Sequence, residues 1–109
     1  MTRKIEKSMN YMVRTQHNWS NSNTSVLTSD NGLESEVFLH GNHIATFDHV
    51  NQKLFLFDGG WQTVTTKSRL NALCDEFATG MGVFQKNWDW FVSDRLTNQV
   101  VPFISGMAV

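Results

Sequence analysis

The sequence predicts an α+β domain in which an antiparallel β-sheet of about five to six strands packs on one central α-helix. Two observations lead to this fold class. Short apolar runs separated by turn residues recur along most of the chain, which is typical of strands joined by hairpins. Between them, the segment near residues 66–78 carries apolar residues at helical spacing. We expect a meander, with closure into a barrel-like sheet as an alternative.

The expected strands are short and are bounded by glycine, asparagine or aspartate. Three or four precede the helix and two or three follow it, within residues 25–28, 36–40, 43–47, 54–57, 83–86, 88–92 and 100–104. Gly41-Asn42 predicts a type II′ hairpin turn, because glycine suits its first central position. The segment from Asn18 to Thr24 is typical of a loop. Pro102 cannot donate to a sheet ladder, so it places the last strand at an edge or at a strand end.

The central helix is predicted over about residues 66–78. Its apolar positions recur at i, i+3, i+4 and i+7 and form one stripe of Leu70, Leu73, Cys74 and Phe77. The hydroxyl of Thr65 or Thr66 can cap the start of this helix. Gly80 can follow its end in a left-handed conformation.

The length of 109 residues corresponds to one domain. We expect residues 21–109 to form a single α+β domain. Residues 1–20 are expected to form a basic N-terminal arm or a short helix, because apolar residues recur there near helical spacing. One helix would leave one face of the sheet poorly covered, so a homodimer is expected unless the sheet closes on itself.

Composition and charge exclude several classes of protein. The 9 basic and 10 acidic side chains give a net charge of −1 with neutral histidine, so total charge does not drive binding to nucleic acid or to an anionic membrane. No apolar run approaches the roughly 18–20 residues of a membrane span, and the basic N-terminus lacks a signal-peptide core. The single cysteine excludes an intrachain disulfide and a multi-cysteine zinc site. A reduced, cytoplasmic setting is therefore expected.

A cluster of hydroxyl and basic side chains opens the predicted helix: Thr65, Thr66, Lys67, Ser68 and Arg69. Lysine and arginine are unfavourable in the first helical turn, where free N–H groups already give a partial positive charge. A bound anion would compensate, so the cluster is a candidate site for a phosphate or carboxylate group. It is not a Walker loop, because the glycine and lysine spacing of that loop is absent. The alternative is that Lys67 and Arg69 pair with acidic residues elsewhere or are solvated.

His40 and His43 flank the expected turn and would face each other across two strands, with their Cβ atoms about 5 Å apart. Such a pair is compatible with two metal ligands, whereas a structural zinc site needs four. Further donors could come from His17, His49 and Asp48. Histidines beside hairpin turns more often form hydrogen bonds or lie at the surface. We therefore expect no metal and no cofactor, with His40 and His43 as weak candidate ligands.

Three tryptophans are candidates for a partner-binding surface: Trp61, Trp88 and Trp90. If residues 88–92 form a strand, Trp88 and Trp90 point to the same face. Trp61 follows a glycine pair and is expected near the edge of the sheet. Exposed tryptophans are typical of protein-interface hot spots and of base-stacking platforms. The alternative is that these side chains form the core of the small domain.

No catalytic constellation is recognised in the sequence, so we expect a protein without enzymatic activity. Cys74 lies on the apolar stripe of the helix and is expected to be a buried hydrophobic residue rather than a nucleophile. The aspartates fall in turn-like positions, where turn chemistry explains them.

Several segments together carry a resemblance to a known family. The most specific runs from Gly59 to Leu73, with the pattern GGWQT-x-TTKSRLNAL, and shorter ones are Trp19-Ser20, Leu39 to Asn42 and Gly82 to Lys86. Over roughly residues 18–105, the sequence resembles a family of small tailed-bacteriophage proteins with no established activity. The resemblance implies a phage accessory protein acting in the bacterial cytoplasm, and it supplies no functional residues to carry over.

The sequence supports three functions to different degrees. The first is binding of a host cytoplasmic protein, which would modulate host function or counter a defence system. The alternative is a module that binds nucleic acid, a nucleotide or a phosphate ligand at the helix start from Thr65 to Arg69. A small hydrolase or metal enzyme is the least supported, because a carboxylate would have to converge with His40 or His43. No membrane partner is expected.

Overall fold

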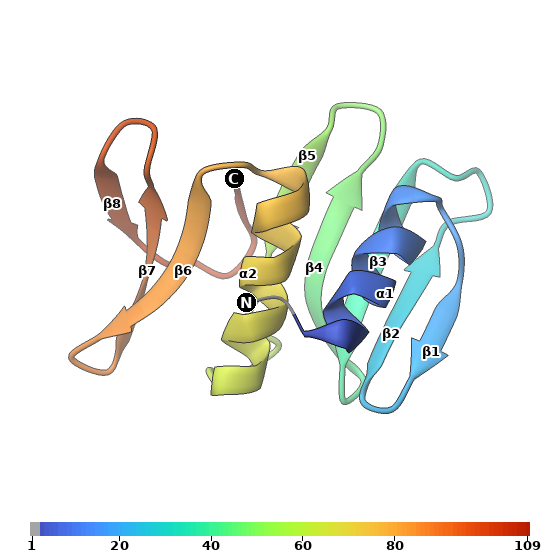
Figure 1. The fold of residues 1–109 in the computed structure, drawn as a ribbon, viewed down its shortest axis with the longest axis horizontal. Coiled ribbons are helices and arrows are strands. Elements are labelled where there is room, and N and C mark those ends of the chain that lie inside the picture. The colour runs from blue at the N-terminus through green and yellow to red at the C-terminus, as the bar shows by residue number, and fades with distance from the viewer. Residues whose placement is uncertain (1–2) are drawn as a thin grey trace.

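Two helices and nine strands make up residues 3–109, the part of the chain that the computed structural model describes (Figure 1). In chain order they are α1 (Lys4–Arg14), β1 (Trp19–Asn21), β2 (Thr24–Thr28), β3 (Glu34–Leu39), β4 (Asn42–Asp48), β5 (Lys53–Leu56), α2 (Val64–Phe77), β6 (Met81–Lys86), β7 (Asp89–Asp94), β8 (Gln99–Pro102) and β9 (Met107–Ala108). The predicted α+β class is confirmed, and so is the short N-terminal helix, α1.

The strands form two antiparallel sheets rather than one. The main sheet has the order β1-β2-β3-β4-β5-β9, and β6, β7 and β8 form a separate three-stranded sheet. The predicted meander is present from β1 to β5, although β1 lies in the segment predicted as a loop. The barrel-like alternative is wrong, because β1 and β9 are the two edges of an open sheet. The edge position predicted from Pro102 is confirmed, since β8 is an edge of the small sheet.

Both helices lie on the same face of the main sheet, and α2 lies between the main sheet and the small sheet (Figure 1). Met9 and Val13 of α1 are fully buried, as are Leu70 and Leu73 of α2. They pack against the inward residues of the main sheet, which include Val26, Val37, Ala45, Leu54 and Leu56. The same core contains Val83, Trp90 and Val92 of the small sheet. One continuous core therefore joins all three layers.

Asn71 connects α2 to the small sheet. Its Nδ2 donates to the carbonyl oxygen of Val83 (2.9 Å), and its Oδ1 accepts from the N–H of the same residue (2.8 Å). The side chain thereby satisfies backbone groups at the edge of β6 that another strand would otherwise satisfy.

The turn between β3 and β4 differs from the predicted one. Leu39 pairs with Asn42, so the two loop residues are His40 and Gly41. Both have positive φ, 52° and 78°, which is type I′ geometry. The predicted type II′ turn at Gly41-Asn42 is therefore wrong by one residue, and His40 lies within the turn rather than beside it.

A β-bulge lies next to this turn. The register of β3 and β4 shifts between Val37 and Phe38, so that Val37 opposes Ala45 and Phe38 opposes His43. Ile44 is the extra residue on β4, and both Ile44 and Ala45 are buried. The bulge brings Ile44 to the helix side of the sheet.

The boundaries of α2 also differ from the prediction. The N-cap is Thr63 rather than Thr65 or Thr66, because Oγ1 of Thr63 accepts a hydrogen bond from the N–H of Thr66 (3.1 Å). Gly80 adopts the expected left-handed conformation, with φ of 93°, but it lies two residues beyond the C-cap, Ala78.

No helix described in residues 3–109 covers the opposite face of the main sheet (Figure 1). On that face the His43 ring lies 5.5 Å from the ring of Phe38 and 4.3 Å from that of Phe57. The homodimer that would cover this face stays a prediction. The register places four charged residues on the same face, which are Glu34, Glu36, Asp48 and Lys53. Two copies docked through it would bring like charges together.

Candidate functional site

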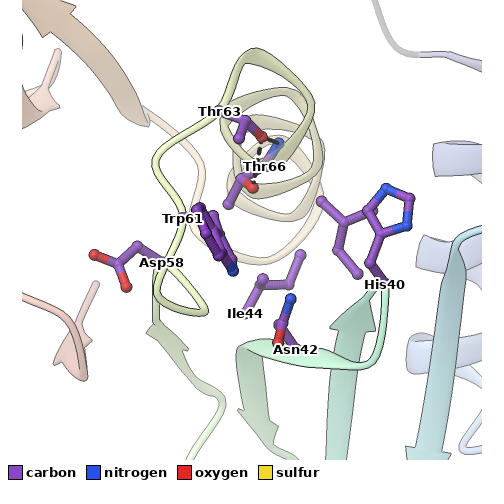
Figure 2. A pocket seen from close by; sticks show the side chains of 8 residues that line it. His40, Asn42, Ile44, Asp58, Trp61, Thr63 and Thr66 are labelled. Atoms are coloured by element: carbon purple, nitrogen blue, oxygen red, sulfur yellow. Dashed lines mark hydrogen bonds between the residues drawn. The ribbon is translucent and has the colours of Figure 1, made fainter.

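A cavity of about 230 Å³ lies beside the first turn of α2 (Figure 2). Its lining comes from the β3–β4 hairpin, from the loop before α2 and from the helix start. The lining residues are Leu39, His40, Asn42, Ile44, Asp58, Trp61, Thr63 and Thr66. The structure thus brings together His40, Trp61 and Thr66, three candidates that the sequence singles out for three different reasons.

The loop from Asp58 to Trp61 presents the tryptophan at the mouth of the cavity. Asp58 accepts through Oδ1 from the N–H of Gly60 (2.9 Å) and through its carbonyl oxygen from the N–H of Trp61 (3.1 Å). Gly59 and Gly60 have φ of 67° and 86°, which glycine adopts without strain. A Cβ atom on Gly59 would lie 3.0 Å from Cβ of Asn42. The glycine pair therefore lets the loop approach β4 closely.

The three candidate tryptophans have different environments. Trp61 is 68% exposed and Trp88 is 88% exposed, whereas Trp90 is 4% exposed. Trp88 lies in the β6–β7 turn with Asn87, at φ of 71° and 53°. The prediction that Trp88 and Trp90 share one face of a strand is therefore wrong. Trp90 belongs to the core, where its ring packs edge-to-face on Phe103 at 5.4 Å.

Arg69, a member of the predicted anion cluster, is buried against α1. Its Nη1 donates to Oε2 of Glu6 at 2.8 Å, and the side chains of Arg69 and Glu6 are 4% and 1% exposed. Its other nitrogens donate to Oγ1 of Thr24 (3.0 Å) and to Oδ1 of Asn23 (3.2 Å). The alternative of pairing with an acidic residue elsewhere is the one observed, and this guanidinium does not face an external anion.

Two more members of the cluster are also engaged within the fold. The hydroxyl of Ser68 donates to Oε2 of Glu6 at 2.6 Å, and the buried Thr66 hydroxyl lies 2.9 Å from that of Thr63. Thr65 and Lys67 remain partly exposed. Anion binding at the start of α2 stays a prediction. The five side chains do not converge as predicted, because Ser68 and Arg69 point towards α1.

Burial raises the pKa of the Glu6 carboxyl group, but hydrogen bonds and charge act more strongly in the opposite direction. The Ser68 hydroxyl, the Arg3 backbone N–H and the Arg69 guanidinium all stabilise the carboxylate. The net result is a lowered pKa for Glu6.

We expect the folded state to lose stability in acid through Glu6. A carboxyl group whose folded pKa is lowered contributes stability that is present above its unfolded pKa of about 4.3 and is lost as the pH falls through the folded pKa. Urea unfolding at pH 7 and at low pH measures this loss. Glu6→Gln, which cannot ionise, should show a smaller difference between the two pH values. Equal differences for the variant and the unaltered protein would contradict the assignment.

His40 and His43 do not form the predicted pair. His40 lies in the turn and lines the cavity, whereas His43 lies on the outer face of the sheet. Nε2 of His43 lies 2.7 Å from Oγ1 of Thr46 and 3.7 Å from Oε2 of Glu36. Within the described residues 3–109, no three side chains of histidine, cysteine, aspartate or glutamate gather closely enough to hold a metal ion.

Cys74 is fully buried on α2. Burial, with a smaller effect from the nearby Asp75 carboxylate, raises the pKa of its thiol to about 12. The thiol is therefore protonated at neutral pH and is not an activated nucleophile.

The sequence analysis did not identify five of the lining residues, Leu39, Asn42, Ile44, Asp58 and Thr63. Leu39 and Ile44 resemble ordinary strand residues, and Asp58 has the turn role expected of it. A usable signal was present, however. Two glycines directly before a tryptophan and a helix start indicate a loop that approaches another segment closely and presents an aromatic side chain.

The family model described as Kyanoviridae Gp96 protein matches residues 2–109. The chain belongs to this family. Kyanoviridae Gp96 is a family of bacteriophage proteins, so the resemblance to phage proteins is confirmed and extends over almost the whole chain. No curated protein and no solved structure shows significant similarity. Neither α1 nor α2 is both long enough and apolar enough to span a membrane.

Proposed function

We propose that this phage protein is a non-enzymatic binding protein that contacts a host cytoplasmic protein, and so modulates host function or counters a defence system. The observation that carries the proposal is Trp61, which stays 68% exposed beside a cavity with apolar walls. Tryptophan is among the residues most enriched in interface hot spots, and such residues cluster around well-packed pockets.

Other apolar side chains accompany Trp61, one of them exposed in the first turn of α2 and two of them in the wall of the cavity. Val64, in the first turn of α2, is 69% exposed. Leu39 and Ile44 form an apolar wall of the cavity, and Figure 2 shows Ile44 beside Trp61. A hollow of about 230 Å³ beside an exposed tryptophan fits one protruding apolar side chain of a partner protein.

The charge at the mouth of the cavity indicates which side chains the partner segment carries. Asp58 is the acidic group of the lining, and it lies on the other side of Trp61 from His40 (Figure 2). The partner segment that fits carries an apolar anchor next to a lysine or an arginine. The charged contact would orient the partner and speed its association.

Affinity purification of the tagged chain from bacterial host cells, followed by mass spectrometry, tests this proposal. We expect a stoichiometric host protein with the unaltered chain, and the same protein with Trp88→Ala. Trp61→Ala should lose most of it, because truncation of a hot-spot tryptophan weakens binding by at least roughly tenfold. Trp88→Ala is the matched control, since it removes a second exposed tryptophan outside the cavity.

The affinity of the recovered partner should then be measured with purified proteins. Equal affinity for Trp61→Ala and for the unaltered chain would overturn the assignment to this cavity. Recovery of no host protein by any of the three chains would count against the function itself.

A further inference from the structure

Trp88 is the most exposed of the large apolar side chains that the structure describes in residues 3–109. It lies at the tip of the β6–β7 hairpin, whose two loop residues are Asn87 and Trp88. Both have positive φ, in the type I′ geometry that asparagine and glycine favour and that tryptophan rarely adopts. The exposed indole contributes no burial that would offset this backbone strain, so folding alone does not explain a tryptophan at the tip.

The hairpin tip carries one charge of each sign beside the indole. Lys86 and Asp89 are the residues directly before and after the loop, and they oppose each other across the two strands. Both are exposed. None of the ion pairs within residues 3–109 uses either of them. The tip therefore presents a large apolar anchor next to a lysine and an aspartate whose charges are available to a partner.

The Trp61 cavity has the complementary arrangement. Asp58 and His40 lie on opposite sides of Trp61 (Figure 2). An apolar cavity of about 150 Å³ holds benzene, so the cavity of about 230 Å³ has room for the rings of an indole. The carboxylate of Asp58 attracts a lysine, and an imidazole N–H of His40 donates to a carboxylate. The chain thus carries, on its own hairpin, an apolar anchor next to a cation of the kind that this cavity fits.

The hairpin tip and the cavity lie at the same end of the molecule. The β6–β7 turn, the start of α2 and the β3–β4 turn all lie towards the bottom of the view in Figure 1. Trp88 does not belong to the lining of its own chain's cavity. A two-fold axis at this end lets each of two copies place its tip at the cavity of the other, which is the reciprocal contact of a closed dimer.

We propose that the Trp61 cavity binds Trp88 of a second copy of this chain, in a reciprocal dimer. The indole enters the cavity against the ring of Trp61, and Lys86 pairs with Asp58. The aspartate of the tip accepts from the imidazole on the other side of the cavity. This contact differs from docking through the open face of the main sheet, where like charges would meet.

The inference rests on the proposed function, because a host segment and the second copy would occupy the same cavity and exclude each other. Two such small contacts make a weak, transient interface, with a Kd of roughly 10–100 μM. The second copy then keeps the apolar cavity covered until a host segment of higher affinity displaces it.

Sedimentation velocity of the purified chain from about 1 to about 300 μM tests the proposal. We expect monomers at the lowest concentration and a reversible dimer at the highest. Trp88→Ala and Trp61→Ala should each raise the Kd of the dimer at least roughly tenfold, because each removes both reciprocal contacts. Val50→Ala, an exposed apolar residue in the β4–β5 turn, is the control and should dimerise like the unaltered chain. Oligomers larger than a dimer would overturn the reciprocal arrangement.

A mixture of the two tryptophan variants separates the anchor from the cavity. Trp88→Ala keeps an intact cavity, and Trp61→Ala keeps an intact anchor. In fluorescence anisotropy, labelled Trp61→Ala should bind Trp88→Ala more strongly than either variant binds itself. The mixed pair should be weaker than the unaltered dimer, since one contact replaces two. Equal dimerisation of a variant and the unaltered chain, or a mixture that does not associate, would overturn the proposal.

A double-mutant cycle tests the ion pair of the contact. Lys86→Gln and Asp58→Asn each remove one charge, and the asparagine keeps an oxygen that accepts from the N–H of Gly60. Each change should weaken dimerisation about threefold to tenfold, and the double variant should dimerise no more weakly than the single ones. Additive effects would overturn the proposed pairing.

The failure of this proposal and the failure of the proposed function are distinguishable. A chain that stays monomeric at all concentrations overturns the dimer and leaves capture of a host protein by the Trp61 cavity unaffected. Recovery of no host protein by Trp88→Ala, whose cavity is free, counts against host binding whether or not the unaltered chain dimerises.

Discussion

Replacement of Arg69 by alanine is expected to lower the free energy of unfolding by about 3–5 kcal/mol. The change leaves the buried carboxylate of Glu6 without its ion-pair partner. It also removes the donors that reach Thr24 and Asn23. Folded domains are stable by only about 5–15 kcal/mol, so the variant should unfold at much lower urea concentration. Urea titration followed by tryptophan fluorescence measures the difference.

Two further variants test whether the loss of stability arises because the ion pair is buried. Arg14→Ala also breaks an ion pair with a glutamate, but those side chains are 52% and 34% exposed, so its loss should be at most about 1 kcal/mol. The double variant Glu6→Leu/Arg69→Met should recover much of the stability, because apolar residues can replace both charges of a buried pair. A loss for Arg69→Ala no greater than that for Arg14→Ala would contradict the buried pair.

Substitution of the two loop glycines is expected to have unequal effects. Gly60→Ala should cost about 1–2 kcal/mol, the strain of a left-handed residue, because nothing lies within 4 Å of the added Cβ. Gly59→Ala should cost about 2–4 kcal/mol, because it adds to that strain contacts of 3.0 Å with Asn42 and 3.3 Å with Ile44. The difference between the unfolding free energies of the two variants measures how much the close contact of the loop with β4 matters.

Urea unfolding of both glycine variants measures this difference directly. Partner capture by the same variants extends it to function, because a loop displaced from β4 no longer holds Trp61 at the cavity. Gly59→Ala should therefore reduce capture more than Gly60→Ala. Equal stability of the two variants would show that the loop does not depend on close contact with β4.

Local patterns were sufficient to predict the strands of the main sheet from β2 to β5 and helix α2. Each has a buried face that repeats at the period of its own secondary structure. The second sheet could not be predicted in the same way, because β6, β7 and β8 have the hairpin spacing of a continued meander. A contact distant along the chain separates them from the main sheet, because the Asn71 side chain of α2 occupies the backbone groups of Val83 at the edge of β6.

The buried ion pair could have been predicted from the sequence. Arg69 was instead interpreted as part of an anion site at the start of the helix. Arg69 lies four residues before Leu73, which places it inside the apolar stripe of α2. Glu6 lies three residues before Met9 and seven before Val13, inside the corresponding stripe of α1. One charge of each sign in two buried stripes predicts that the helices meet through them, because buried charges require partners.

The shape of the cavity could not be derived from the sequence, because it depends on how residues 39–44 meet residues 58–66, two segments that are separate along the chain. It needs the one-residue shift at the His40–Gly41 turn and the bulge at Ile44. Neither has a strong local signature. A turn at Asn87 follows from the predicted strands on either side of it, but the position of Trp88 within that turn is hidden, since tryptophan rarely adopts positive φ.

The Glu6–Arg69 contact also determines when the first helix can dock during synthesis. The two residues are 63 positions apart, so at about 5–20 residues per second Glu6 is made several seconds before its arginine. Until Arg69 emerges, docking of α1 would bury an uncompensated carboxylate. Helix α1 is therefore made before α2 but takes its final place only after α2 has emerged, and a chain that stops short of α2 keeps α1 undocked.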